Sequence, residues 1–320
     1  MTQEASQAAP LHAPVLPTEV LECLAPRPGE IVVDATVGAG GHAWLLASGL
    51  GTQGRFFGFD VDEAALQIAG RRLADCACKV ALLRRNFTEL AEALREQGVM
   101  GVDVLLADLG VSSMQLADAG RGFSFNADGP LDMRMDDRLP RRAADLVNTL
   151  REGELSDLIW NLSQERASRR IAQRICSVRR EARITTTGQL VDIICRATGT
   201  KPRAHPGKIH PATRTFQALR VAVNDELGAL RGLLEQAPGL LNPGGRVGII
   251  AFHSLEDAVV KKDFRRRKEE GVYELVNKRP IVAGEEERRA NPRSRSAKFR
   301  AARRTQPGEC TSKEVGAYGA

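Results

Sequence analysis

A glycine-rich stretch lies between a short apolar run and a helix-like segment, which is the arrangement of a nucleotide-binding turn. The apolar run occupies residues 31–33, and the turn follows at residues 34–43. Small residues let the backbone bend sharply and pass close to a ligand before a helix begins. Residues 38–43 fit the pattern G-x-G-x-x-G/A, and Asp60 stands where a ribose-binding carboxylate belongs, at the end of the next strand. The alternative is a glycine-rich turn that binds nothing.

The acidic residues around this turn favour one class of nucleotide over another. NAD and S-adenosylmethionine both use such a turn, whereas a phosphate-binding P-loop is excluded because no Gly-Lys-Ser/Thr follows. A carboxylate at Asp34, directly before the turn, would repel a pyrophosphate but would attract a sulfonium and an amino group. Asp60, Asn86 and Asp108 end the following apolar runs. We therefore expect an acidic cup that binds S-adenosylmethionine.

Several other chemistries are excluded by spacing. The cysteines lack C-x-x-C spacing, which argues against a zinc ribbon, a disulfide scaffold and a zinc deaminase, and no metal site is expected. No cysteine stands in a motif at a strand end, so a cysteine nucleophile is not expected. The scattered cysteines indicate reduced cytosolic thiols. His253, Ser254 and Asp257 do not form a hydrolase triad, because no G-x-S-x-G turn surrounds Ser254.

The order of elements predicts a doubly wound, Rossmann-like α/β fold with an inserted helical domain. Short apolar runs alternate with helix-like stretches up to about residue 110, and another run follows at 246–252. Between these parts lie a loop rich in Gly, Asp and Arg and then amphipathic helices, after which a long helix is expected from residue 210. We predict a discontinuous methyltransferase-like domain at 1–116 and 210–290, a helical insertion at 117–209, and a basic, partly disordered tail at 291–320.

Composition points to a globular protein with an uneven charge. The chain has 320 residues, 42% of them hydrophobic, and a net charge of +6. It has no apolar run long enough to cross a membrane and no visible secretory signal, so a cytoplasmic protein is expected. Acidic residues prevail in 1–116, whereas basic residues prevail in 117–209 and most strongly in 261–304. This asymmetry suggests a polyanionic partner, although a basic run such as 261–268 is equally explained as a solvated helix face.

Seven blocks of sequence together resemble a known family. They are DATVGAGGH (34–42), DLGVSSMQL (108–116), RGFSF (121–125), PLDMRMD (130–136), HPATRTFQALRVAVNDEL (210–227), FHSLED (252–257) and NPRSRSAKFR (291–300). In this order they are similar to the bacterial ribosomal RNA small-subunit methyltransferase H family. Ala117 and Ala258 depart from residues that are usual in that family, outside the cofactor blocks.

The resemblance implies an activity and a set of site residues. Members of the family use S-adenosylmethionine to methylate N4 of a cytidine in the decoding region of 16S rRNA, within the small ribosomal subunit. The matching blocks imply that the glycine turn contacts the cofactor and that other residues contact its ribose, its adenine and the end that carries the methyl group. The residues implied are Gly40, Gly41, His42, Asp60, Phe87, Asp108 and Gln115. His42 is equally explained as a first-turn helix residue.

The acceptor nitrogen needs activation, and Asp108 is the candidate catalytic residue. The lone pair of a cytosine exocyclic amine is conjugated with the ring, so it must be turned toward the methyl group. Asp108, or backbone carbonyls beside Leu109, could accept the N4 hydrogens. The alternative is that Asp108 only caps the next helix or holds the cofactor.

RNA contacts are expected from the insertion and the tail. The candidates are Arg134, Lys208, His210, Arg214, Arg293, Arg295 and Lys298. The alternative is that such arginines pair with nearby acidic residues, as Arg134 could with Asp132 or Asp136. Because aromatic residues make up only 4% of the chain, we expect recognition of phosphates and RNA shape, with binding that weakens steeply with salt. The sequence requires no protein partner and leaves monomer and homodimer open.

Two other classes of protein remain as alternatives. A nicotinamide-dependent dehydrogenase would bind NADH and would need no basic tail. A non-enzymatic RNA-binding factor would bind RNA without retaining S-adenosylmethionine. Calorimetric titration with both cofactors distinguishes the three.

Overall fold

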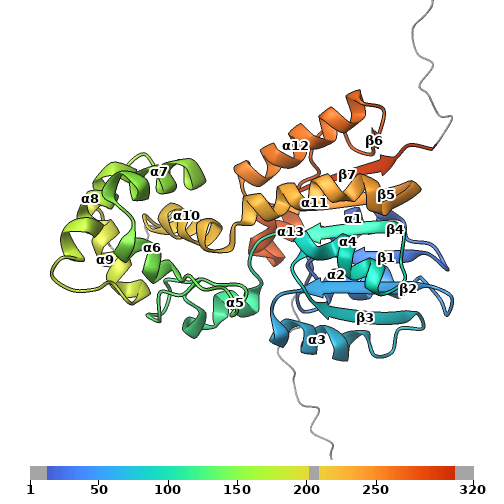
Figure 1. Cartoon of the computed structure of the whole chain (residues 1–320), viewed down its shortest axis with the longest axis horizontal. Coiled ribbons are helices and arrows are strands. Elements are labelled where there is room, and N and C mark those ends of the chain that lie inside the picture. The colour runs from blue at the N-terminus through green and yellow to red at the C-terminus, as the bar shows by residue number, and fades with distance from the viewer. Residues whose placement is uncertain (1–12, 202–208, 307–320) are drawn as a thin grey trace, which may run out of the picture. The chain divides into compact units, whose positions relative to one another are not determined.

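The computed structural model describes residues 13–201 and 209–306 and divides into two compact units (Figure 1). We call them the sheet unit, with boundaries Met1–Leu109 and Leu230–Ala320, and the helical unit, Gly110–Ala229. None of the described helices combines the length and the apolar character that a membrane span requires.

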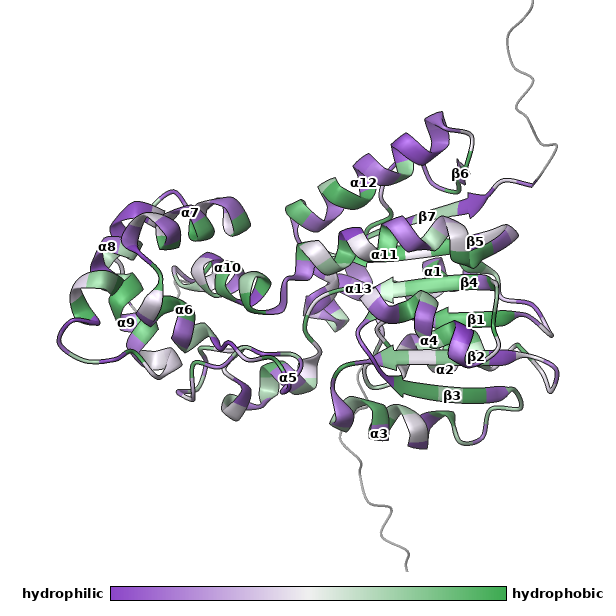
Figure 2. Cartoon of the chain, in the orientation of Figure 1, coloured by the Kyte–Doolittle hydropathy of each residue, from purple (hydrophilic) through white to green (hydrophobic). Residues whose placement is uncertain are grey.

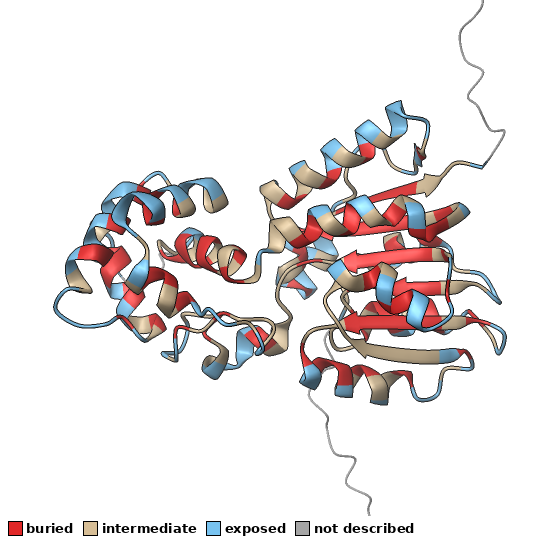
Figure 3. Cartoon of the chain, viewed as in Figure 1, coloured by how far each residue is buried: buried red, intermediate tan, exposed pale blue. Residues whose placement is uncertain are grey.

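A seven-stranded sheet in the order β3-β2-β1-β4-β5-β7-β6 forms the centre of the sheet unit. The strands are β1 (Ile31–Asp34), β2 (Arg55–Asp60), β3 (Lys79–Arg84), β4 (Val102–Asp108), β5 (Leu241–Ala251), β6 (Tyr273–Leu275) and β7 (Lys298–Arg304). The first five strands are parallel, and β7 is antiparallel to β5 and β6. Strands β1, β2 and β4 are largely buried, since helices cover both faces of the sheet (Figure 3).

Successive residues of the inner strands pack into two separate cores, one on each face of the sheet. Val33 packs with α4 (Leu90–Glu96), α11 (Glu226–Leu240) and α12 (Ser254–Glu269), whereas Val32 packs on the opposite face. The opposite core is covered by α1 (Pro17–Leu24), α2 (Gly41–Ala47) and α3 (Glu63–Leu73). The predicted doubly wound, Rossmann-like fold is confirmed.

The helical unit has a core of its own, built from amphipathic helices. Its elements are α5 (Ser113–Ala117), η2 (Ala119–Arg121), α6 (Ala143–Thr149), α7 (Glu152–Ser163), α8 (Ser168–Val178), α9 (Thr187–Thr198) and α10 (Thr213–Asn224). Each of α6 to α10 turns its apolar residues into one cluster that includes Ile159, Ile171 and Phe216. Figure 2 shows the alternation of hydrophobic and hydrophilic faces along these helices.

The structure differs from the sequence prediction at the unit boundaries and in the tail. The helical unit begins at Gly110 and ends at Ala229, rather than at 117 and 209. The long helix expected from residue 210 is interrupted at Asp225, whose φ of 45° is left-handed. Of the tail predicted to be partly disordered, residues 291–306 are described and contain η3 (Pro292–Ser296) and β7, whereas residues 307–320 lie outside the described part of the chain.

Burial of alternate apolar residues and neutralised charge explain why this basic segment forms a strand. Phe299 and Ala301 are buried in β7. The charges beside them are compensated, because Arg300 Nε donates to Asp257 Oδ1 at 2.7 Å and Lys298 Nζ donates to Asp257 Oδ2 at 3.1 Å. Burial would raise the pKa of Asp257, but the bonds from Arg300 and Lys298 hold it below its usual range. The carboxylate of Asp257 on α12 thus binds two basic side chains of β7.

We expect Asp257→Asn to lower the free energy of unfolding by about 2 kcal/mol, because it leaves the partly buried Arg300 without its ionic partner. A carboxyl whose pKa is lowered by folding stabilises above its unfolded pKa. The difference from wild type should therefore be full above about pH 4 and should shrink as the pH falls further. Urea denaturation at pH 3 and pH 7 measures this.

The matched control is Glu285→Gln, which breaks the exposed pair between Glu285 and Arg289 on α13 (Glu285–Ala290). It should leave stability nearly unchanged. Equal effects of the two substitutions would contradict the role of Asp257.

Candidate functional site

Three carboxylates stand at the carboxyl edge of the parallel strands. Asp34 ends β1, Asp60 ends β2 and Asp108 ends β4. Asp34 is in register with Gly58 on one side and with Leu106 on the other, so the three strand ends are neighbours. Ligands of open α/β sheets bind at this edge, where the loops leave the strands.

The turn after β1 needs its glycines. Gly38 and Gly40 have φ of 50° and 78°, in the left-handed region. A Cβ on Gly40 would lie 3.1 Å from the Ala69 Cα of α3, so the turn and the helix approach as closely as glycine allows. Asp60 Oδ2 accepts a hydrogen bond from Gly38 N–H at 2.8 Å and its Oδ1 accepts one from Asp62 N–H at 2.9 Å. Asp60 therefore shapes the turn, with lone pairs left for a ligand.

Asp34 lies beneath the turn rather than facing a ligand. It is 1% exposed, and its Oδ1 accepts a hydrogen bond from Thr36 N–H at 3.0 Å. The Thr36 hydroxyl in turn accepts a bond from Asp108 N–H at 2.6 Å. Burial raises the pKa of Asp34 to about 7, although the charge of His42 opposes this. The negative charge that a ligand can reach comes from Asp60 and Asp108, which corrects the expected role of Asp34 as a cup residue.

Asp108 has an oxygen atom that is buried and lacks a hydrogen-bond partner in the described part of the chain. This atom is Oδ1, and the other oxygen, Oδ2, lies 3.5 Å from His42 Nδ1. The side chain as a whole is 21% exposed. An unpaired buried carboxylate oxygen is costly, so its retention indicates a partner supplied from outside the protein.

His42 lies between Asp108 and the chain that precedes α1. Its Nε2–H donates to the Val15 carbonyl at 2.7 Å, and the residue is 5% exposed. Since a carbonyl can only accept, a second proton on Nδ1 is needed to face Asp108. Burial alone would lower the pKa of His42, but the bond to Asp108 and the charges of Asp108 and Asp34 raise it. The structure thus makes His42 a positioning residue for Asp108.

Arg293 acts on the same carboxylate, although the sequence places it among the RNA candidates. It belongs to η3, and its guanidinium carbon lies 5.7 Å from the centre of the Phe252 ring. Burial lowers the pKa of Arg293, and the negative charge of Asp108 opposes that shift. No local pattern could reveal this relation, because Asp108 and Arg293 are far apart in the sequence.

Phe87 and Gln115, also predicted as cofactor residues, have structural surroundings of their own. Phe87 begins η1 (Phe87–Glu89) directly after β3 and is partly buried against the sheet core. Gln115 belongs to the helical unit, where its Oε1 accepts the Ser112 N–H at 3.0 Å in a capping box of α5. Their contacts with a cofactor stay predictions.

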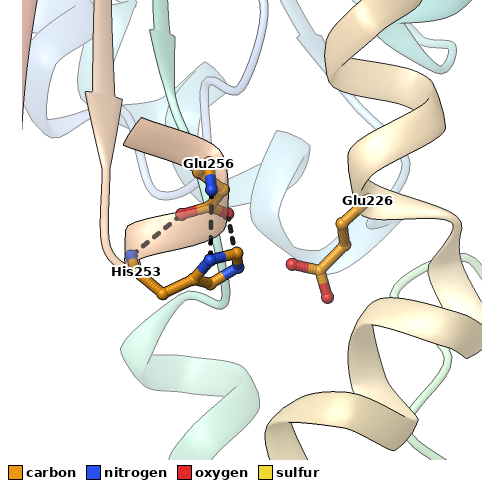
Figure 4. A group of neighbouring side chains, drawn as sticks. All are labelled: Glu226, His253 and Glu256. Carbon is orange, nitrogen blue, oxygen red and sulfur yellow. Dashed lines mark hydrogen bonds and ion pairs between the residues drawn. The ribbon is translucent and has the colours of Figure 1, made fainter. Parts of the chain in front are cut away.

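The segment after β5 is organised by a histidine and a glutamate (Figure 4). Glu256 Oε2 accepts the N–H groups of Phe252 and His253 at 2.8 and 3.2 Å. His253 Nδ1 accepts the Glu256 N–H at 3.3 Å, which completes a capping box at the start of α12. These contacts give His253 and Glu256 a role in fixing the turn, consistent with the absence of a hydrolase motif.

Some of the residues predicted to contact RNA are bound to other groups of the protein, whereas others are exposed. Arg134 is occupied, because it donates to both oxygens of Asp132 and to the carbonyls of Asp137 and Leu139. His210 stacks on Phe125 with ring centres 4.5 Å apart.

Arg214 and Arg295 are exposed, and their guanidinium groups each contact one backbone carbonyl at 3.4 Å. Lys298 is held by Asp257. Lys208 lies outside the described residues.

Comparison with known proteins gives a consistent picture. The sequence profile of the MraW methylase family matches residues 9–305. A protein of Geobacter sulfurreducens named "Ribosomal RNA small subunit methyltransferase H" is 51% identical over 307 residues, covering 91% of this chain and 98% of its own. A Deinococcus radiodurans protein of the same name is 50% identical over 309 residues, covering 95% and 94%.

Solved structures show a weaker similarity. An rRNA methylase of Streptococcus thermophilus aligns with a TM-score of 0.40 at 14% identity, covering 91% of this chain and 94% of that one. Aeropyrum pernix fibrillarin, crystallised with S-adenosyl-L-methionine, aligns with a TM-score of 0.38 at 12% identity, covering 89% and 74%.

We expect His42→Gln to destabilise the protein in a pH-dependent way, because the neutral amide loses the charge that faces Asp108. A histidine whose pKa is raised by folding stabilises fully below its unfolded pKa of about 6.5, and that contribution is lost as the pH rises through the folded value. The deficit relative to wild type should thus be largest near pH 6 and smaller at pH 9, as urea denaturation would measure. A constant deficit would show that His42 is neutral throughout.

Proposed function

Since the chain belongs to the MraW methylase family, we propose that it is an rRNA methyltransferase acting on the small ribosomal subunit. It transfers a methyl group from S-adenosylmethionine to N4 of a cytidine in the decoding region. The observation that supports the mechanism is the buried Oδ1 of Asp108 at the end of β4, which has no hydrogen-bond partner among the described residues. The turn after β1 lies beside it, and a side chain at Gly40 would crowd Ala69.

The residues at the strand ends fit the proposed cofactor. Gly40 and Gly41 let the turn pack closely against Ala69 and Pro14, which sets the path of the backbone that a ligand would approach, and Asp60 retains lone pairs for ribose hydroxyls. Phe87 stands at the end of β3 as an apolar neighbour for an adenine. Asp60 and Asp108 present carboxylates at this edge, which would attract a sulfonium and repel a pyrophosphate. When bound, S-adenosylmethionine supplies an electrophilic methyl carbon.

Asp108 prepares the acceptor amine. Its Oδ1 accepts a hydrogen bond from N4–H of the cytosine, which turns the nitrogen lone pair away from conjugation and toward the methyl carbon. As the bond from N4 to the methyl carbon forms, the bond from that carbon to sulfur would break and leave a neutral thioether, and Oδ1 would take the proton that the nitrogen loses. A carboxylate is needed for this, and His42, whose Nδ1 lies 3.5 Å from Oδ2, orients it. The positive charge of Arg293 also acts on Asp108.

The direct test is to analyse the nucleosides of small-subunit rRNA after incubation with the protein and methyl-labelled S-adenosylmethionine. Subunits from cells that lack the activity are the substrate. We expect label in N4-methylcytidine at one decoding-region position. Label in another nucleoside, or none with intact subunits and with free rRNA, would refute the proposed specificity or the activity.

Asp108→Asn should lower the turnover rate for methylation about 100-fold or more, because the amide cannot take the N4 proton. Single-turnover assays at saturating cofactor measure this, and calorimetry measures cofactor affinity separately. Asp103→Asn is the matched control, since Asp103 lies at the other end of β4 and accepts the Ile31 N–H at 2.8 Å. It should affect stability alone. If Asp108→Asn only weakened cofactor binding and left turnover intact, Asp108 would hold the cofactor and not act on the amine.

A further inference from the structure

The outer face of α8 carries a row of arginines. The helix buries Ile171, Ala172 and Ile175 in the core of the helical unit, and its opposite side is exposed. That side, continued into the turns at both ends of the helix, presents exposed arginine side chains. They are Arg166, Arg169, Arg170, Arg174 and Arg180. We call this set the arginine face. At about 100° per residue these positions fall on one side of a helix, so their charges point in a common direction.

The arginine face is not neutralised within the described chain. No side chain of the face forms an ion pair or hydrogen bond with another described residue, and α8 itself contains no acidic residue. Three other exposed arginines of the same unit have acidic partners. Arg151 pairs with Glu154, Arg138 with Asp136, and Arg183 with Asp145. Acidic partners are thus common in this unit but are lacking on this face.

A second basic helix shows what an ordinary solvated face looks like. In α12 of the sheet unit, Arg265 pairs with Glu269 and Arg266 pairs with Asp263 and Glu270. The arginines of α12 are therefore paired with carboxylates, including Arg267, which pairs with Glu235. On α8, by contrast, Arg170 and Arg174 stand one turn apart, where like charges repel and weaken the helix. This arrangement does not stabilise the folded helical unit, and it therefore indicates an anionic partner outside the protein.

Groups suited to nucleic acid adjoin the arginine face. The exposed Arg214 donates to the Gln164 carbonyl at 3.4 Å and so lies against the turn that joins α7 to α8. Trp160, in the last turn of α7, is 49% exposed, and its carbonyl accepts the Gln164 N–H. An indole that is half in solvent beside unpaired guanidinium groups can stack on an unpaired base while the guanidinium groups bind phosphates.

We propose that the arginine face, with Arg214 and Trp160 beside it, is the surface through which the helical unit binds the phosphate backbone of the rRNA substrate. This inference rests on the proposed function and assigns its RNA-binding surface. Guanidinium groups bind phosphates in bidentate fashion, and a row of them matches the regular spacing of charge along an RNA strand. Binding through this face is therefore insensitive to base sequence and strongly dependent on salt.

The test variant combines Arg169→Gln, Arg170→Gln and Arg174→Gln in the full-length protein. Glutamine keeps the helix propensity and removes the charge. The matched control combines Arg138→Gln, Arg151→Gln and Arg183→Gln, which removes the same charge from paired arginines of the same unit. Both are compared with wild type for affinity toward small-subunit rRNA and intact subunits at several salt concentrations, for cofactor affinity, and for thermal unfolding.

We expect the test variant to bind rRNA about 10- to 100-fold more weakly and to lower the slope of log affinity against log salt by about 2. Its cofactor affinity should be unchanged and its melting temperature equal to or above that of wild type, because repulsion is relieved. Adding Trp160→Ala should weaken binding further at high salt. The control should retain most of the wild-type affinity.

Three results would overturn the proposal. These are unchanged rRNA affinity of the test variant, an equal loss in the control, and a loss seen with intact subunits but not with free rRNA, which would indicate a ribosomal protein as the partner. Failure of the proposed function is a separate result. Wild type would then bind rRNA without methylating it, and the affinities would still decide the role of the arginine face.

Discussion

The pairing of the buried His42 with the partly exposed Asp108 is the interaction on which the site depends. Three carboxylates end neighbouring strands. Burial, with a smaller contribution from the charges of Asp108 and Asp60, raises the pKa of Asp34 to about 7, whereas Asp108 has His42 beside Oδ2 and an oxygen, Oδ1, without a hydrogen-bond partner among the described residues. The glycine turn, Thr36 and Arg293 each hold one part of this arrangement in place. A cationic ligand would complete its charge balance.

The sequence predicts local features of the fold well, because they depend on neighbouring residues. The apolar runs that end in Asp34, Asp60 and Asp108 correspond to β1, β2 and β4, and the glycine turn has the expected left-handed backbone. Features that depend on distant partners were missed. The strand at 298–304 reads as a basic tail until its pairing with β5 and its contacts with Asp257 are known.

The meaning of charged residues is the part that the sequence could not supply. Arg134 and Lys298 were predicted to contact RNA, but each is bound to a carboxylate of its own unit. Two helices, α8 and α12, are rich in basic residues. The structure shows that the arginines of α12 are paired with carboxylates, whereas those of α8 are not.

The position of β7 between β5 and β6 has a consequence for biosynthesis. The sheet closes with a strand that follows all the others in the sequence, and β6 pairs only with β7 among the described strands. While the polypeptide is being made, the edge of β5 stays open until residues 298–304 leave the ribosome's exit tunnel. Contacts of such long sequence separation form slowly. The complete sheet, and the proximity of Arg293 to Asp108, therefore form only after residues 298–304 have left the tunnel.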